Sequence, residues 1–480
     1  MSEEVRGFPC AIQHHYQPTG RDEDVPLYTG NISFIGEEGR PYAGDVRFTW
    51  RRTPRILMRG TRPVEVDEID QYFTASEGGS IWADLKGVAI EMPGQLIPDQ
   101  PSEASAGPAA SPTETFLRVD ERLDQQLGDG VNLEQVTFLI PNGWEPSREE
   151  SRICDPMDSD FTWFGRTQAQ GGGWTVVFDR IRAVDSKAYE ELRASGGRRF
   201  THVGSISRTD GGMFDGQSAI NALERIRLGL CLSLGRRSSC VLPVGYRQKK
   251  PVWSFWHATP IDEFSNTSHF LDATICARQI SEIVSCVLDF TGETVHLETL
   301  THALSYYVAA NVDVDVHLQA SLPISGLQLL AFFEFVTSGP YTHKQWNAMA
   351  PEDRRTEWEL SQLLVKVNVS TPIPLHFQSL MALQKRLAKA GTICDALGVV
   401  IKMRNVATHP TKEQPGNYSL TEWAEAGMLA RYWLGLALLH SVAYQGDIAA
   451  ILQSRPRRSG QLRPAPWTQQ WSAGQPPSGS

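Results

Sequence analysis

The stretch LHFQSLMALQKRLAKAGTICDALGVVIKMRN (375–405) carries the longest helical pattern in the sequence. Its apolar residues recur three or four positions apart, which is the spacing of one face of an α-helix. The stretch therefore predicts one long helix that buries a single apolar stripe. The residues of this stripe are Leu383, Leu387, Ala390, Cys394, Leu397 and Ile401.

Other segments after residue 270 show the same helical period. The last of them begins with Ser419 and has Glu422 three residues on, which is the pattern of a capping box at a helix N-terminus. An all-α bundle is therefore expected from about residue 270 to residue 453. The segments are 272–288, 296–310, 324–336, 352–367 and 419–445.

The first half of the chain has a different pattern. Short segments rich in β-branched and aromatic residues alternate with Gly, Pro, Asn and Asp, and only 218–235 reads as a helix among them. We therefore expect an α+β multidomain protein, in which a β-rich, sandwich-like N-terminal domain precedes the helical bundle. The predicted strands include 27–36, 44–52, 55–63, 135–143 and 173–181.

These patterns predict four parts along the chain. A β-rich domain covers 1–250 and includes a Pro/Ala/Ser-rich loop at 98–114, whose composition is typical of disorder. A connecting helical segment follows at 251–290, and the helical domain covers 291–453. The end of the chain, 454–480, is rich in Pro, Gly, Ser and Gln with four arginines, which predicts a flexible basic tail.

Composition excludes several classes of protein. The net charge is −10, so the chain lacks the overall basic character of many nucleic-acid-binding proteins. The acidic N-terminus does not read as a secretory signal, and no apolar run is long enough to predict a membrane span. The seven cysteines are scattered without a CxxC pair, which favours reduced thiols in a cytoplasmic protein. No motif predicts a bound metal ion or cofactor.

The segment IKMRNVATHP (401–410) carries the candidate site. The next step of the apolar stripe after Ile401 falls on Arg404, so this arginine is expected to point towards the interior. Pro410 disfavours helical geometry at His409, and the helix should end just before that histidine. Asn405 adds a neutral donor and acceptor beside the arginine.

Arginine and histidine so close together suit the cleavage of RNA without a metal ion. Arginine grips a phosphate through its planar fork of donors, and histidine exchanges protons near neutral pH. Residues five apart on a helix point about 140° apart, so the helix break or a second copy in a homodimer would be needed to complete the site. Lys402, Lys385 and Lys389 are expected to help bind the RNA strand.

Residues 290–453 resemble a HEPN domain. The signature of that family is an arginine, four to six residues and a histidine, often with a polar residue directly after the arginine, and Arg404-Asn405-Val406-Ala407-Thr408-His409 fits it. The helices on either side resemble the ApeA-like HEPN group, in which a β-rich domain precedes the helical one. The resemblance implies a metal-independent, dimeric endoribonuclease that acts in abortive infection against phage, with a phage-derived or other trigger sensed by the N-terminal domain.

Several residues have plainer interpretations. Arg404, Asn405 and His409 also fit a helix C-terminus whose basic residues meet the helix dipole. The chain would then be a non-catalytic binding or scaffold protein, whose helical domain dimerises or binds nucleotide. Glu334 is either a buried partner of Arg404 or an edge residue. The segment DPMDSD (155–160) has aspartates that could hold a cation, but it is more typical of a solvated turn.

Overall fold

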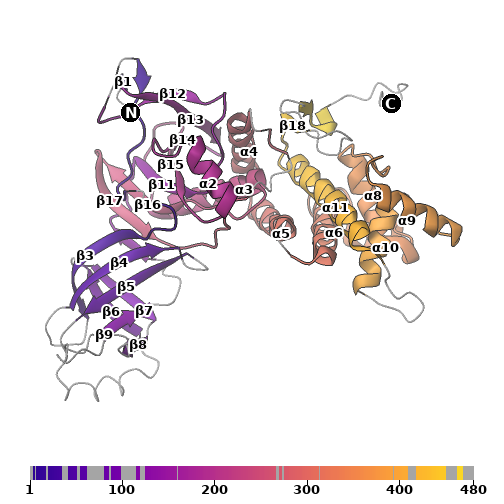
Figure 1. Cartoon of the computed structure of the whole chain (residues 1–480), viewed down its shortest axis with the longest axis horizontal. Helices are drawn as coiled ribbons and strands as arrows, with labels where there is room; N and C mark the ends of the chain where they lie inside the picture. The colour runs from indigo at the N-terminus through magenta and orange to yellow at the C-terminus, as the bar shows by residue number, and fades with distance from the viewer. Residues whose placement is uncertain are drawn as a thin grey trace.

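The computed structural model describes residues 4–34, 42–61, 80–98, 115–118, 125–408, 418–449 and 462–468, apart from short gaps inside these ranges. Figure 1 shows the strands at one end of the molecule and the helical bundle at the other, with helices α3 and α4 between them. The predicted fold class, a β-rich domain followed by a helical one, is confirmed.

An antiparallel sheet of eight strands forms the centre of the β-rich half. Its strand order is β10-β17-β16-β11-β15-β14-β13-β12, so neighbours in the sheet come from distant parts of the sequence. The strands are β10 (Gln125–Gly128), β11 (Gln135–Pro141), β12 (Ser151–Cys154), β13 (Thr162–Gly171), β14 (Trp174–Arg180), β15 (Phe200–Arg208), β16 (Val241–Arg247) and β17 (Lys250–Trp256).

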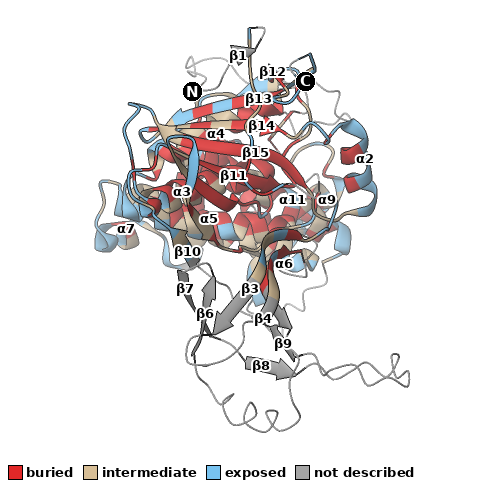
Figure 2. Ribbon diagram, turned by 90° about the vertical axis from the view of Figure 1, so that its left-hand side faces the viewer, coloured by how far each residue is buried: buried red, intermediate tan, exposed pale blue. Residues whose placement is uncertain are grey.

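The two faces of this sheet are buried against different partners, as the alternation of side chains along β11 shows. Phe138 faces the helices α3 (Gly216–Leu234) and α4 (Cys276–Phe290), and packs in one core with Ile226 and Ile280. Leu139, next along the strand, belongs to a second core on the opposite face. Figure 2 shows the strands of this sheet buried between their neighbours.

A five-stranded sheet supplies the second core. Its order is β5-β4-β3-β6-β7, and Val25, Phe48 and Ile56 at one end pack against Phe200 and Val244 of the larger sheet. Its strands are β3 (Val25–Phe34), β4 (Tyr42–Thr49), β5 (Arg55–Thr61), β6 (Ser80–Leu85) and β7 (Val88–Pro93). Two further strand pairs are β1 (Glu4–Val5) with β2 (Phe8–Pro9), and β8 (Gln95–Pro98) with β9 (Thr115–Arg118).

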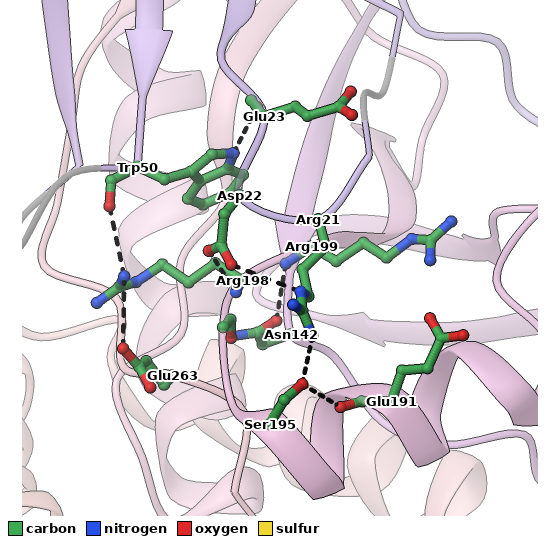
Figure 3. A network of polar contacts seen from close by, with 11 residues as sticks. Arg21, Asp22, Glu23, Trp50, Asn142, Glu191, Ser195, Arg198, Arg199 and Glu263 are labelled. Carbon is green, nitrogen blue, oxygen red and sulfur yellow. Dashed lines mark hydrogen bonds and ion pairs between the residues drawn. The ribbon is translucent and has the colours of Figure 1, made fainter.

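A polar network joins the two sheets where these apolar residues meet (Figure 3). The Asp22 carboxylate accepts the backbone N–H of Arg198 at 2.8 Å, and Trp50 Nε1 donates to the Glu23 carbonyl at 2.7 Å. Asn142 Oδ1 accepts the backbone N–H of Arg199 at 3.0 Å. The bond between Asp22 and Arg198 crosses from the segment before β3 to the segment before β15, and so ties the smaller sheet to the larger one, whereas the other two bonds each lie on one side.

The helical half is built around α11 (Leu420–Ser441), which packs most extensively on α6 (Val316–Phe332). Trp433 and Leu434 are fully buried there, in a core that also takes Tyr307. The capping box of Ser419 and Glu422 is present as predicted. The remaining helices are α5 (Thr294–Asn311), the π-helical turn η3 (Phe333–Thr337), α7 (His343–Met349), α8 (Arg355–Lys366), α9 (Gln378–Lys389) and α10 (Ala396–Thr408).

In the described part of the chain, one helix is long and apolar enough to cross a membrane, at Val316–Thr337. This segment is α6 with its π-helical end. Ile324, Leu327 and Leu330 on it are buried in the core of the bundle. Its neighbours α5 and α11 pack along it, so its apolar composition is accounted for by packing between helices.

The prediction of one long helix over 375–405 is wrong. Helix α9 ends at Lys389 and α10 begins at Ala396. Gly391 takes a φ of 85°, which a side chain would disfavour, and so the chain turns there. Asp395 then accepts the N–H of Gly398 at 3.0 Å, which is the bond of an N-cap residue. The apolar stripe continues in phase across this turn, which is why the sequence conceals it.

The predicted boundaries also need correction. Strand β17 (Lys250–Trp256) occupies the start of the segment expected to be helical, because Trp253 and Trp256 each face a buried side of the sheet. The helical half is not purely α, since β18 (Asp447–Ala449) pairs with β19 (Leu462–Pro464). Residues 462–468 of the expected flexible tail are therefore ordered, and Trp467 Nε1 donates to the Tyr444 carbonyl at 2.7 Å. The predicted loop at 98–114 lies outside the described residues, apart from its first.

Candidate functional site

Helix α10 presents the candidate residues in its last two turns. The structure describes it as far as Thr408, so the predicted helix end just before His409 stays a prediction. Thr408 Oγ1 donates to the carbonyl of Arg404, four residues earlier on the same helix, at 3.0 Å. His409 itself lies outside the described residues, so its distance from Arg404 stays a prediction.

Arg404 is half-buried and its charge has no carboxylate partner in the part of the chain that the structure describes. Its Nη1 donates to Asn405 Oδ1 at 3.1 Å, and this is the contact that orients the guanidinium. Its Nε is buried and has no hydrogen-bond partner among the described residues. A cationic group with unused donors is costly inside a protein, and an anionic ligand would remove that cost.

The side chain of Lys402 reaches back to the turn before α10, and the other two predicted substrate-binding lysines lie on α9, which ends at that turn. Lys402 Nζ donates to Thr392 Oγ1 at 3.1 Å, in the turn between α9 and α10. The side chains of helical residues two positions apart differ in direction by about 200°, so Lys402 leaves α10 on the side opposite Arg404. Lys385 and Lys389 are exposed on α9.

The contact of Gln384 Nε2 with the Cys394 carbonyl at 2.8 Å places this basic turn of α9 beside the start of α10. Arg404 lies about 12 Å further along that helix, at the rise of an α-helix. The structure therefore brings Arg404 and Asn405 together, and separates them from the lysines.

Helix α9 is held in place by acidic residues of α11. Arg386 forms an ion pair with the buried Glu422 at 3.1 Å. Glu425 accepts the backbone N–H groups of Ser379 at 3.3 Å and Leu380 at 2.8 Å, and so satisfies the start of α9. The charge of Arg386 is thus neutralised within the protein, while Lys385 and Lys389 on the same helix stay exposed.

Two of the alternatives left open by the sequence are resolved. Glu334 does not pair with Arg404, because its carboxylate binds Lys366 at 2.5 Å and Ser441 Oγ at 3.0 Å. The segment 155–160 forms a turn, in which Asp155 accepts the N–H of Met157 at 2.8 Å and pairs with Arg182 at 2.7 Å. Among the described residues, no group of His, Cys, Asp or Glu is arranged to hold a metal ion.

A buried polar cluster in the large sheet was not foreseen. Glu150 and Arg180 face one another, with 3.6 Å between a carboxylate oxygen and Nε, and the ring of His202 stacks on Trp144 at 3.9 Å. Both carboxylate oxygens of Glu150 and Nε2 of His202 are buried without a hydrogen-bond partner among the described residues. These residues come from three separate segments, the connection between β11 and β12, strand β14 and strand β15, so no spacing in the sequence points to the cluster.

Burial governs the titration of this cluster. Burial raises the pKa of Glu150 to about 7, although the charge of Arg180 acts in the opposite direction. Burial also lowers the pKa of His202 well below its ordinary value, so this histidine stays neutral. Glu150 is therefore a buried carboxyl group that gains and loses its proton near neutral pH.

Replacing Glu150 by Gln is expected to change how stability depends on pH. Because the pKa of Glu150 is raised from 4.5 to about 7 in the folded state, the folded protein holds this proton more tightly. The stabilisation by the neutral form is complete below the unfolded pKa and is lost as pH rises through about 7. Urea unfolding should show that, from about pH 5 to pH 8, the wild type loses about 2 kcal/mol relative to Glu150→Gln.

The control for this measurement is Glu149→Gln, which removes a carboxylate from an exposed position next along the chain. A constant difference between wild type and Glu150→Gln over this pH range would show that Glu150 is ionised throughout, and would contradict the account of the cluster.

Comparison with known proteins divides the chain into two matched regions, which correspond to parts of the β-rich half and the helical half of the structure. Residues 128–267 match the YopA central domain. Residues 293–461 match the YopA C-terminal domain. The first match covers the eight-stranded sheet, apart from most of β10, together with α3. The second match covers the bundle from α5 to β18. Helix α4, which lies between the two matches, packs on both parts.

A search of curated proteins found a relative in Bacillus subtilis. The chain is similar to the "SPbeta prophage-derived uncharacterized protein YopA" of Bacillus subtilis (strain 168), with 29% identity over 260 residues. The alignment covers 53% of this chain and 56% of the relative, so it spans about half the length of each. No solved structure matches the chain. These comparisons do not include a HEPN domain, so the HEPN resemblance stays a prediction.

Proposed function

We propose that this protein is a metal-independent endoribonuclease that cleaves RNA by attack of the 2′-OH on the adjacent phosphorus. The observation that carries the proposal is Arg404, whose half-buried guanidinium has no carboxylate partner among the described residues. Asn405 orients it, and the described part of α10 reaches Thr408, next to His409 in the sequence. An arginine held in this way is ready to bind a phosphate.

Each residue of the motif has a role in this reaction. Arg404 grips the scissile phosphate and stabilises the charge that develops on it. His409 takes the proton from the 2′-OH or delivers one to the leaving oxygen. Asn405 orients the phosphate or the histidine. Two chains pair through their helical domains, so that two copies of the motif meet at one cleft.

The lysines bind the RNA strand away from the bond that breaks. Lys385 and Lys389 of α9, and the Nζ of Lys402, lie near the turn between α9 and α10. The start of α10 is about 12 Å from Arg404 along the helix axis. An extended strand that crosses both places would meet cations at one end of α10 and the arginine at the other. These contacts would add affinity without choosing the cleavage site.

The β-rich half regulates the helical half in this proposal. Helix α3 of the matched central domain contributes Leu228 and Leu232 to the core of the bundle, and Asn311 of α5 donates to the Gly235 carbonyl at 3.0 Å. Binding of a trigger to the β-rich half would therefore reach α5 through a packed interface. The role in this proposal is antiphage defence in the cytoplasm; the name of the B. subtilis relative links that protein to a prophage.

A non-catalytic scaffold is the second candidate. It is favoured by the net charge of −10 and by the separation of the three lysines from Arg404. In this case the helical domain would dimerise or bind nucleotide, and Arg404 would serve the end of α10 alone.

A substrate comparison in EDTA tests the enzymatic proposal. The purified full chain should cut an RNA oligonucleotide and leave the same sequence in DNA intact, because DNA lacks the attacking 2′-OH. An RNA with a single 2′-deoxy nucleotide at the cleavage site should lose cleavage at that position alone. Cleavage of the DNA, or cleavage at the deoxy position, would exclude the proposed chemistry.

A further inference from the structure

Two cysteines lie in contact at the edge of the large sheet. Cys154 ends β12, and Cys10 lies beside it in a short parallel β-bridge. Their sulfur atoms are 3.4 Å apart and are not joined in a disulfide. The backbone N–H of Ala11 donates to the Cys154 carbonyl at 2.9 Å, which fixes the two segments side by side.

The backbone at this pair already suits a covalent bond. Neighbouring strands lie about 4.8 Å apart, which is inside the range of about 4.4–6.8 Å between the Cα atoms of a disulfide. The sulfur atoms need to approach from 3.4 Å to about 2 Å, a change that side-chain rotation can supply. The chain therefore needs little rearrangement to close the bond.

The segment that begins at Cys10, residues 10–17, forms one wall of a pocket and is called the N-terminal strap here. The pocket has a volume of about 310 Å³. The strap residues that line it are Ala11, Ile12, Gln13, His14 and Gln17. The opposite wall comes from β13 and β14 and the turns beside them, and includes Trp163 and Arg182.

Non-covalent contacts hold the strap in place. The backbone N–H of Ile12 donates to Asp179 at 2.7 Å, and Arg166 donates to the Cys10 carbonyl at 2.8 Å. His14 Nε2 bonds to the Leu242 carbonyl at 2.9 Å. Such contacts break and re-form whenever the segment opens locally. A covalent bond would remain closed during these openings.

We propose that Cys10 and Cys154 form a reversible disulfide that locks the N-terminal strap over this pocket. A peroxide is the oxidant. The Cys10 thiolate, which is half-buried, attacks one peroxide oxygen and becomes a sulfenic acid, while the other oxygen leaves as water. The buried Cys154 thiol then displaces the sulfenic hydroxyl as a second water, and the disulfide forms. The two thiols lose two electrons and two protons, and hydrogen peroxide becomes two water molecules.

The surroundings of other cysteines favour reaction at this pair. Burial raises the pKa of Cys276 to about 12 and that of Cys286 to about 11, so both thiols stay protonated at neutral pH. The thiolate is the species that reacts with peroxide, and these two cysteines are therefore slow. A dithiol reductant of the cytoplasm would reopen the bond, as expected for a redox-sensing pair.

Mass spectrometry of the full chain tests the proposal. After brief treatment with hydrogen peroxide and alkylation, a non-reducing tryptic digest should contain residues 7–21 joined to residues 153–166. The joined peptide should disappear with dithiothreitol and in Cys10→Ser, and should persist in the control Cys286→Ser. If both cysteines of the treated protein are recovered as alkylated thiols or as sulfonic acids, the proposal is wrong.

Hydrogen exchange tests the effect on the strap. In the oxidised wild type, the backbone amides of residues 11–17 should exchange at least about tenfold more slowly than in the reduced protein, because the bond blocks local opening. Cys10→Ser should show no difference between the two conditions. A disulfide that forms without slowing exchange in residues 11–17 would contradict the locking of the strap.

Discussion

Arg404→Ala is expected to lower the rate of RNA cleavage at least about a thousandfold, because the scissile phosphate would lose its principal cationic contact. The variant should fold as well as the wild type. The Nε of Arg404 is buried without a partner among the described residues, and its one side-chain bond is to Asn405 next to it. Cleavage assays in EDTA and thermal unfolding of the same preparations measure the two effects.

Matched arginine variants separate phosphate binding from general charge. Arg404→Lys keeps the charge but loses the planar fork, so an intermediate rate is expected. Arg386→Ala removes an arginine from the neighbouring helix α9, where it pairs with Glu422, and should change the rate by no more than about threefold. Equal rates for the wild type and a folded Arg404→Ala would show that this arginine serves the helix end alone.

Gly435→Val is expected to destabilise the protein by about 3 kcal/mol or more. A Cβ atom at Gly435 would lie 1.9 Å from Cζ of Phe270, far inside contact distance. Phe270 is buried in the core of the bundle and stacks on Tyr307, with 6.1 Å between the ring centroids. The ring has no room to withdraw without opening that core, so α11 or the Phe270 segment must move.

The control for this variant is Gly427→Ala on the same helix, where the nearest contact of a new Cβ is Gln319 at 3.3 Å. The gain of about 1 kcal/mol in helix propensity should offset that mild crowding. Urea unfolding of both variants checks the expectation. Similar stabilities for Gly435→Val and Gly427→Ala would mean that α11 does not pack on Phe270 as described.

The local parts of this fold were predictable from the sequence. The capping box at Ser419 and Glu422 was read directly, and α11 begins there. Helix α7 was missed, although Thr342 and Gln345 form the same kind of box and gave a usable signal. The turn between α9 and α10 was missed for another reason, since Gly391 interrupts the helix without disturbing the three-and-four spacing of the apolar residues.

The candidate site also has a part that the sequence predicts and a part that it does not. Arg404, Asn405 and Thr408 contact one another along a single helix, so helical geometry alone predicts that they are close. Lys385 and Lys389 were grouped with them because the helix was assumed to be continuous, and Lys402 because it is close in sequence, although its side chain turns away to Thr392. The contacts of Glu150 with Arg180, and of Cys10 with Cys154, depend on how separate segments meet at the large sheet. No periodicity along the chain carries that information.

The account depends most directly on His409 as the group that moves the proton. The decisive measurement is cleavage of one RNA oligonucleotide in EDTA by the wild type and by His409→Ala, with the ends of the products analysed. The wild type should release products that end in a 2′,3′-cyclic phosphate or a 3′-phosphate, and His409→Ala should release none above background. Cleavage that requires Mg²⁺, or that persists in His409→Ala, would contradict the account.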